Sequence, residues 1–342
     1  MVVFFIFIAL LCLWGFGFRK DSDGDYLSKV QGNAVKGIFI LMVILFHANG
    51  YVREAGYAYS QWSDPLFLGI RAKFGQLIVV MFLFFSGYGV MSSIRSKGEA
   101  YVKAMPRHRI LNVLVNFDVA VICFALVQWL LGQVFPAGQY LLSLVAWEEI
   151  GNSNWYIFVI LLCYAATWLS AKLFKSGWKT LALTLALLCP LYVLLVHFKA
   201  PHWYNTMIAY PLGMAACLGK KRLDALGKTG FYWPALAAGF ICLALTYIHH
   251  EDPVGLVHSF RSVVFASVMV LLLMKVKVGN PALNWLGKNL FPLYIYQRIP
   301  MILLNHFDPR GITAGHPVVF IALSFVFTIA LVPLVNKLTI RL

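Results

Sequence analysis

The stretch VKGIFILMVILFHANGY, residues 35–51, predicts one apolar helix with a lysine near its start and a histidine near its end. Lys36 and His47 are eleven residues apart, close to three turns, so both project from one face of the helix about 16 Å apart. One side of the helix therefore carries a cation and a base. Because polar groups are costly inside a lipid-spanning helix, we expect these two to have a function.

The composition places the chain among polytopic membrane proteins. It is 61% hydrophobic and 12% charged, far from the balance of a soluble domain. Its six cysteines all fall in apolar runs and lack the paired spacing of metal ligands, so they predict packing residues and no metal site. The formal net charge of +15 is interpreted as a signal of membrane topology and not of nucleic-acid binding.

Apolar runs of the length needed to cross a bilayer predict an all-α helical bundle with about 11 transmembrane helices. Residues 1–17 are expected to form an N-terminal transmembrane anchor, and residues 30–342 the main membrane domain. The expected spans are residues 1–17, 36–52, 75–94, 110–134, 154–174, 179–197, 203–219, 232–249, 259–276, 289–306 and 317–337.

The lysines and arginines predict the orientation of these spans. Most of them fall on alternate connections, and basic residues are retained on the cytoplasmic side of short loops. The N-terminus is therefore expected outside and the C-terminus in the cytoplasm. This orientation puts Lys36 at the cytoplasmic edge of its helix and His47 toward the outer face.

Five short segments, in order along the chain, resemble the membrane acyltransferase family 3. The spacing Lys36-x10-His47 is similar to the family's Arg/Lys-x10-His signature. Two differences stand out: many members have arginine at the position of Lys36, and a histidine commonly follows the late tyrosine run, where this chain has Gln297 and Arg298. The other resembling segments are MFLFFSGYG (81–89), RHRIL (107–111), NWYI (154–157) and LYIY (293–296).

The resemblance implies a ten-helix acyltransferase core, with the first span as an addition to it. It implies a multi-pass enzyme of a bacterial-type cytoplasmic (plasma) membrane. Such an enzyme moves an acyl group, usually acetyl, from cytoplasmic acyl-coenzyme A to a hydroxyl of a cell-envelope glycan outside. Acyl-coenzyme A is then a donor substrate and no cofactor is bound. A transporter or flippase for a lipid-linked or polar solute is the alternative, since it would use the same kind of bundle and intramembrane charges.

The expected chemistry centres on His47 as general base or acyl relay, because an imidazole titrates near neutral pH. Lys36 is a second candidate catalytic residue, with snorkelling to the interface as its alternative role. The basic loop that carries Arg95, Lys97, Lys103, Arg107 and Arg109 is a candidate for holding the donor's phosphates, with Arg95, Arg107 and Arg109 as the expected binding residues. Retention of positive charge on the cytoplasmic side is the alternative explanation for each residue of this loop.

Further candidates lie nearer the outer face. Glu148 and Glu149 are expected either to orient His47 or to bind sugar hydroxyls, or else to be solvated loop charges. Trp155 is a candidate wall of the acyl channel or a sugar-stacking residue. Arg298 lies inside an expected span and should stabilise an oxyanion or bind a substrate anion, or else pair with Asp118 or a cluster of carbonyl groups.

Overall fold

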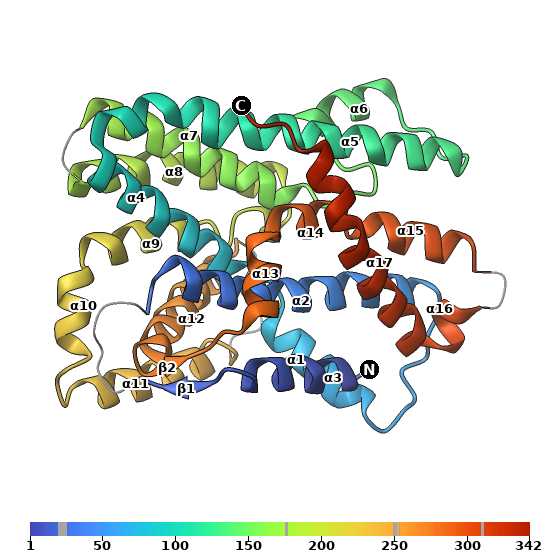
Figure 1. Ribbon diagram of the computed structural model, residues 1–342, viewed down its shortest axis with the longest axis horizontal. Coiled ribbons are helices and arrows are strands. Elements are labelled where there is room, and N and C mark those ends of the chain that lie inside the picture. The colour runs from blue at the N-terminus through green and yellow to red at the C-terminus, as the bar shows by residue number, and fades with distance from the viewer. Residues whose placement is uncertain (20–25, 175–176, 249–251, 253, 309–310) are drawn as a thin grey trace.

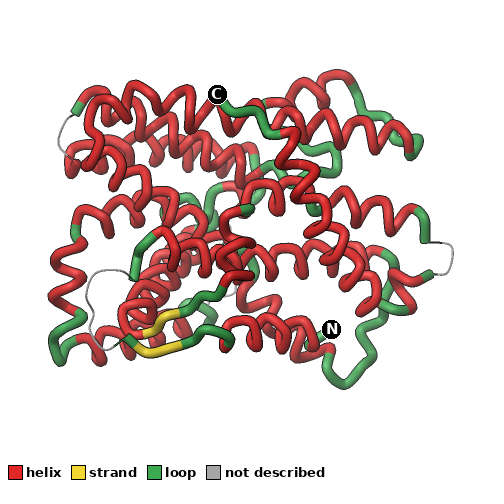
Figure 2. Tube along the Cα trace, in the orientation of Figure 1, coloured by secondary structure: helices red, strands yellow, loops and turns green. Residues whose placement is uncertain are grey.

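The structure, a computed structural model, is an all-helical bundle (Figures 1 and 2). It describes residues 1–19, 26–174, 177–248, 252, 254–308 and 311–342. Helices take up 78% of the chain and strands 1%, which confirms the expected all-α class. The helices are α1 (Val3–Leu13), α2 (Lys29–Glu54), α3 (Asp64–Phe74), α4 (Leu77–Met105), α5 (Asn112–Leu130), α6 (Ala137–Leu144), α7 (Trp155–Leu173), α8 (Gly177–Phe198), α9 (Ala209–Leu218), α10 (Lys220–Leu226), α11 (Tyr232–Leu245), α12 (Leu256–Lys275), α13 (Pro281–Lys288), α14 (Leu290–Tyr296), α15 (Arg298–His306), α16 (Ile312–Gly315) and α17 (Pro317–Leu338).

Four short elements complete the described part of the chain. A π-helical segment, η1 (Pro106–Leu111), joins α4 to α5, and a 3-10 turn, η2 (Pro201–Trp203), precedes α9. The strands β1 (Gly17–Phe18) and β2 (Val276–Lys277) form an antiparallel pair at one edge of the molecule (Figure 2). This pair ties the chain after α1 to the end of α12.

Among the described residues, six helical stretches are long and apolar enough to cross a membrane, so the expected count of about 11 spans is not confirmed. The apolar helices α1, α9 and α11 are shorter than a full span. The expected span 289–306 is divided into α14 and α15. Several apolar helices therefore support a multi-pass membrane protein, without fixing how many of them span the bilayer.

Helix α2 runs through the middle of the bundle (Figure 1) and is buried over most of its length. It begins at Ser28, whose hydroxyl accepts a hydrogen bond from the Gln31 N–H at 3.2 Å, as an N-cap does. Glycines let α13 approach it closely: a Cβ on Gly37 would collide with the Leu283 carbonyl, and one on Gly287 with the Asn33 carbonyl. This close packing fixes α2, and with it Lys36 and His47, against the rest of the core.

Helices α4 and α9 cross at a second pair of glycines. A Cβ on Gly87 would collide with the Tyr210 carbonyl, and one on Gly213 with the Phe84 carbonyl. The segment 86–89 therefore serves close helix packing through Gly87, whereas Gly89 lines a cavity. Small residues at such crossings are typical of helices that pack inside membranes.

Candidate active site

A basic cavity of about 700 Å³ lies between α2, α4, η1 and α7. Its wall carries four cationic side chains and several hydroxyl groups, and no described residue that lines it is acidic. The cations are Lys29, Lys36, Lys97 and Arg109. An uncompensated cluster of this kind attracts a polyanion such as a phosphate group.

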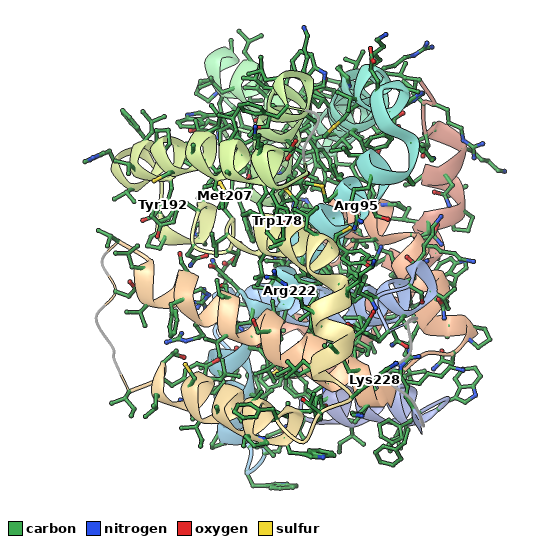
Figure 3. All side chains as sticks on the ribbon, turned by 90° about the vertical axis from the view of Figure 1, so that its left-hand side faces the viewer. Arg95, Trp178, Tyr192, Met207, Arg222 and Lys228 are labelled. Atoms are coloured by element: carbon green, nitrogen blue, oxygen red, sulfur yellow. The ribbon has the colours of Figure 1, made fainter. Side chains whose placement is uncertain are left out.

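Arg109 enters this cavity from the π-helical segment η1. Its Nε donates to the Tyr101 hydroxyl at 3.0 Å, which leaves its other guanidinium donors for a ligand. Of the other two arginines expected to bind the donor, Arg107 is exposed and lines no described cavity. Arg95 instead donates to the Cys217 carbonyl at 3.0 Å, and it lies on the side of the molecule that also carries Arg222 and Lys228 (Figure 3). The structure thus brings only Arg109 together with Lys36.

Lys29 was not among the expected site residues, whereas Lys97 belongs to the basic loop that was expected to hold the donor's phosphates. Lys29 lies seven residues, about two helical turns, before Lys36 and so shares its face of α2. Lys97 follows Gly89 and Ser93 at intervals of four residues on α4, and all three line the cavity. These spacings are visible in the sequence. That the two faces meet is a property of the tertiary packing.

His47 lines a second, smaller cavity of about 260 Å³. The other polar residues on its wall are Arg71, Gln76, Trp155 and Tyr294. The Nδ1 atom of His47 and the Nε atom of Arg71 are buried without a hydrogen-bond partner among the described residues. Because buried polar atoms in native proteins are nearly all paired, these two mark a place where a polar ligand fits.

Tyr294 places a hydroxyl group at this cavity. The side chain is only 2% exposed, and its Oη has no partner among the described residues. The adjacent Gln297 is fully buried, and its Nε2 donates to the Tyr294 carbonyl at 2.9 Å while its Oε1 is unpaired. Gln297 also lies close enough to His47 for their side chains to interact. It therefore occupies a position from which it can orient the imidazole ring.

A serine and three tyrosines lie in contact between the two cavities. The Ser86 side chain and Tyr164 line the basic cavity, and Ser86 interacts with both Tyr164 and Tyr156. The Tyr156 ring lies 5.1 Å from the ring of Tyr294 at the His47 cavity. These four side chains thus form a chain of contacts from the basic cavity to the His47 cavity.

The expected outer residues lie around the His47 cavity, but with partners of their own. Glu148 pairs with Lys199 at 3.2 Å, and Glu149 lies 3.7 Å from Arg298. Neither glutamate lines the cavity, whereas Trp155 does. Trp155 also meets His202 edge to face, with 6.0 Å between the ring centroids. Burial, reinforced by the charge of Lys199, lowers the pKa of His202 below its usual 6.5.

Arg298 does not pair with Asp118. Its Nη1 donates to the Asn152 carbonyl at 3.2 Å in addition to its contact with Glu149. The Oδ1 atom of Asp118 is buried without a partner in the described part of the chain. Because Arg298 follows Gln297 directly, its positive charge lies next to the His47 cavity.

Comparison with known protein families identifies the chain. A family model described as an acyltransferase domain, Acyl_transf_3, matches residues 32–337. The chain belongs to this acyltransferase family. The matched region contains all of the residues that line the His47 cavity and most of those that line the basic cavity, whose Leu27, Ser28 and Lys29 precede it. Helix α1 lies outside the matched region. Comparisons with curated proteins and with solved structures give no match.

Membership makes this protein a membrane acyltransferase and confirms the resemblance noted in the sequence. It gives no support to the transporter alternative. Within the acyltransferase, the basic cavity and the His47 cavity are the two described cavities that share α2. They form the candidate active site.

Proposed function

We propose that this acyltransferase takes an acyl group, in the first instance acetyl, from acyl-coenzyme A in the cytoplasm and transfers it to a hydroxyl of a cell-envelope glycan outside. One observation carries the proposal: Lys36 and His47 lie on one continuous helix, each in the wall of a different cavity. They are separated by about 16 Å along the helix axis. A charged donor held at one cavity can present its acyl end toward the other.

The basic cavity supports donor binding from the cytoplasmic side. Coenzyme A carries several phosphate charges, which cannot enter hydrocarbon, on a long and narrow arm that ends in the thioester. Lys29, Lys36, Lys97 and Arg109 can hold the phosphates by charge-assisted hydrogen bonds. The arm would then follow Ser86 and Tyr156 toward His47. Under the positive-inside rule this orientation also places the N-terminus outside and the C-terminus in the cytoplasm.

In the transfer step His47 acts as general base. It removes the proton from the acceptor hydroxyl while the oxygen attacks the carbonyl carbon of the thioester, forming a C–O bond. The C–S bond then breaks, and His47 returns the proton to the departing thiolate, so that free coenzyme A and an ester are the products. The Tyr294 hydroxyl, which lacks a partner among the described residues, donates to the oxyanion that forms between these steps. Gln297 positions the imidazole, and Arg71 and Arg298 add positive charge nearby.

The proposal is tested with purified protein in lipid vesicles, acetyl-coenzyme A and a crude envelope glycan as acceptor. Free coenzyme A released by wild type should be lost in His47→Ala, since general base catalysis contributes about 10² to 10⁴-fold. His306→Ala is the matched control, because His306 is exposed and lines neither cavity. Full activity of His47→Ala would refute the assigned mechanism.

A further inference from the structure

A third cavity, of about 360 Å³, lies where the end of α3, η2 and the start of α12 meet. It differs from the basic cavity because its wall combines cations, hydrogen-bond acceptors and an aromatic ring. The polar residues on its wall are Lys73, Asn205, Tyr247, Asp252, His258 and Arg261. No step of the proposed acyl transfer uses any of them.

Two buried polar atoms in this wall lack partners. Asn205 is 4% exposed, and its Oδ1 has no hydrogen-bond partner among the described residues. The same holds for the buried Nε2 atom of His258. A carboxamide oxygen accepts hydrogen bonds and an imidazole nitrogen accepts or donates them. Because unpaired buried groups of this kind are rare in native proteins, they point to a ligand that carries hydroxyl groups.

The charges in the wall favour a ligand that is also negatively charged. Lys73 Nζ lies 4.6 Å and Arg261 Cζ 4.1 Å from the ring centroid of Tyr247. The one described carboxylate, Asp252, is already held by the first turn of α12, since its oxygens accept from the Val257 N–H at 3.1 Å and the His258 N–H at 2.7 Å. The helix start therefore stabilises the acid, and the cations keep donors for a ligand.

Hydrogen bonds hold the backbone of Lys73 and the side chain of Arg261 at this cavity. The Tyr247 hydroxyl donates to the Lys73 carbonyl. Arg261 donates through Nε to the Thr246 hydroxyl at 3.0 Å and through Nη2 to the Thr246 carbonyl. Its Nη1 is left for a ligand. The Lys73 side chain is exposed, so it is reached from outside the core.

Residues of α3 line both the third cavity and the His47 cavity. Arg71 lines the His47 cavity, whereas Ala72 and Lys73 line the third cavity. These residues are consecutive on α3, and each position along a helix is turned by about 100° from the one before. The two cavities therefore lie against different faces of the same helix.

We infer that the third cavity is a binding subsite for a sugar bearing a carboxylate or phosphate, so that the acceptor is an acidic glycan. The role of this sugar as acceptor rests on the proposed function, whereas its binding in the third cavity does not. Lys73 and Arg261 pair with the anionic group, while Asn205 and His258 bind hydroxyls of the same sugar or of its neighbour. Neutral glycans lack the first of these interactions and bind more weakly.

The test measures binding of three oligosaccharides of equal length to purified protein: one carboxylated, one phosphorylated and one neutral. His47→Ala protein is used beside wild type, so that binding is measured without turnover. Either acidic oligosaccharide should bind more tightly than the neutral one. Lys73→Glu should weaken acidic binding at least tenfold, as expected for the loss of a charge-assisted hydrogen bond. Lys73→Arg should keep the affinity for the acidic oligosaccharides close to that of wild type. Neither change should alter binding of the neutral oligosaccharide.

Equal binding of acidic and neutral oligosaccharides, or Lys73→Glu protein with unchanged acidic binding, would overturn the inference. Arg53→Glu is the control for general surface charge, because Arg53 is exposed and does not line the cavity. If the acidic oligosaccharide binds as expected but is never acylated, the subsite stands and the proposed function alone fails. Preference between the two acidic oligosaccharides identifies which anionic group the subsite takes.

Discussion

Replacing Tyr294 by phenylalanine separates catalysis from stability at the His47 cavity. The Oη atom has no partner among the described residues, so its removal leaves no other protein group unpaired. The ring keeps its place 5.1 Å from the Tyr156 ring, and the side chain is 2% exposed in the native protein. Removal of an unpaired buried hydroxyl should leave stability unchanged or raise it by about 1 kcal/mol. Loss of one oxyanion donor should lower kcat by about 10² to 10³-fold, or about 2.7–4 kcal/mol.

The assay is the initial rate of coenzyme A release in vesicles, with a thermal unfolding curve of the same preparation. Tyr232→Phe is the matched control, because Tyr232 is 1% exposed but its hydroxyl donates to the Leu271 carbonyl at 2.8 Å, away from both cavities. It should lose about 1 kcal/mol of stability and keep its kcat. Tyr294→Phe with wild-type kcat would show that the hydroxyl takes no part in the transition state.

Three further changes test other parts of the structure. Lys36→Met should raise the apparent KM for acyl-coenzyme A by about 10- to 100-fold, because Lys36 lines the basic cavity. Arg107→Met is the control and should change this KM little, because Arg107 is exposed. Equal effects of the two changes would show that general surface charge governs donor affinity. Gly87→Ala should lower stability by about 1–3 kcal/mol, since the Cβ of the new alanine would meet the Tyr210 carbonyl. An unfolding curve identical to wild type would contradict the close packing of α4 against α9. The depressed pKa of His202 means that the unfolded state binds more protons just below pH 6.5, so stability should fall as pH drops from 7.5 to 5. His202→Gln should flatten this dependence in unfolding curves, and an unchanged pH dependence would exclude His202 as its source.

The features that sequence predicted best are the local ones. The apolar run around residues 35–51 fixes α2, because a helix of that length and hydropathy needs no distant partner to be recognised. Its period also places Lys36 and His47 at a defined separation along the helix. The count of about 11 spans is not confirmed, because α1, α9 and α11 are shorter than a full span and the stretch Asp64–Leu130 covers two of the expected spans. The apolar run of residues 289–306 is also divided, into α14 and α15.

The features that sequence could not supply are the pairings between distant segments. Lys29 and Lys97 join Lys36 only because α2 and α4 pack side by side. Arg298 contacts Glu149 and not Asp118. Hydropathy and spacing do not determine which of these two acids it contacts. The third cavity likewise requires α3, η2 and α12 to meet. Each of these depends on tertiary packing, which one sequence does not specify by pattern alone.

The central claim is that one chain takes the acyl group at the Lys36 cavity and releases it at the His47 cavity, on opposite faces of the membrane. Its most direct test places labelled acetyl-coenzyme A on one side of sealed proteoliposomes and the glycan acceptor on the other. We predict labelled ester on the acceptor side with wild-type protein and none with His47→Ala. Ester that forms only when donor and acceptor share one side would contradict the claim.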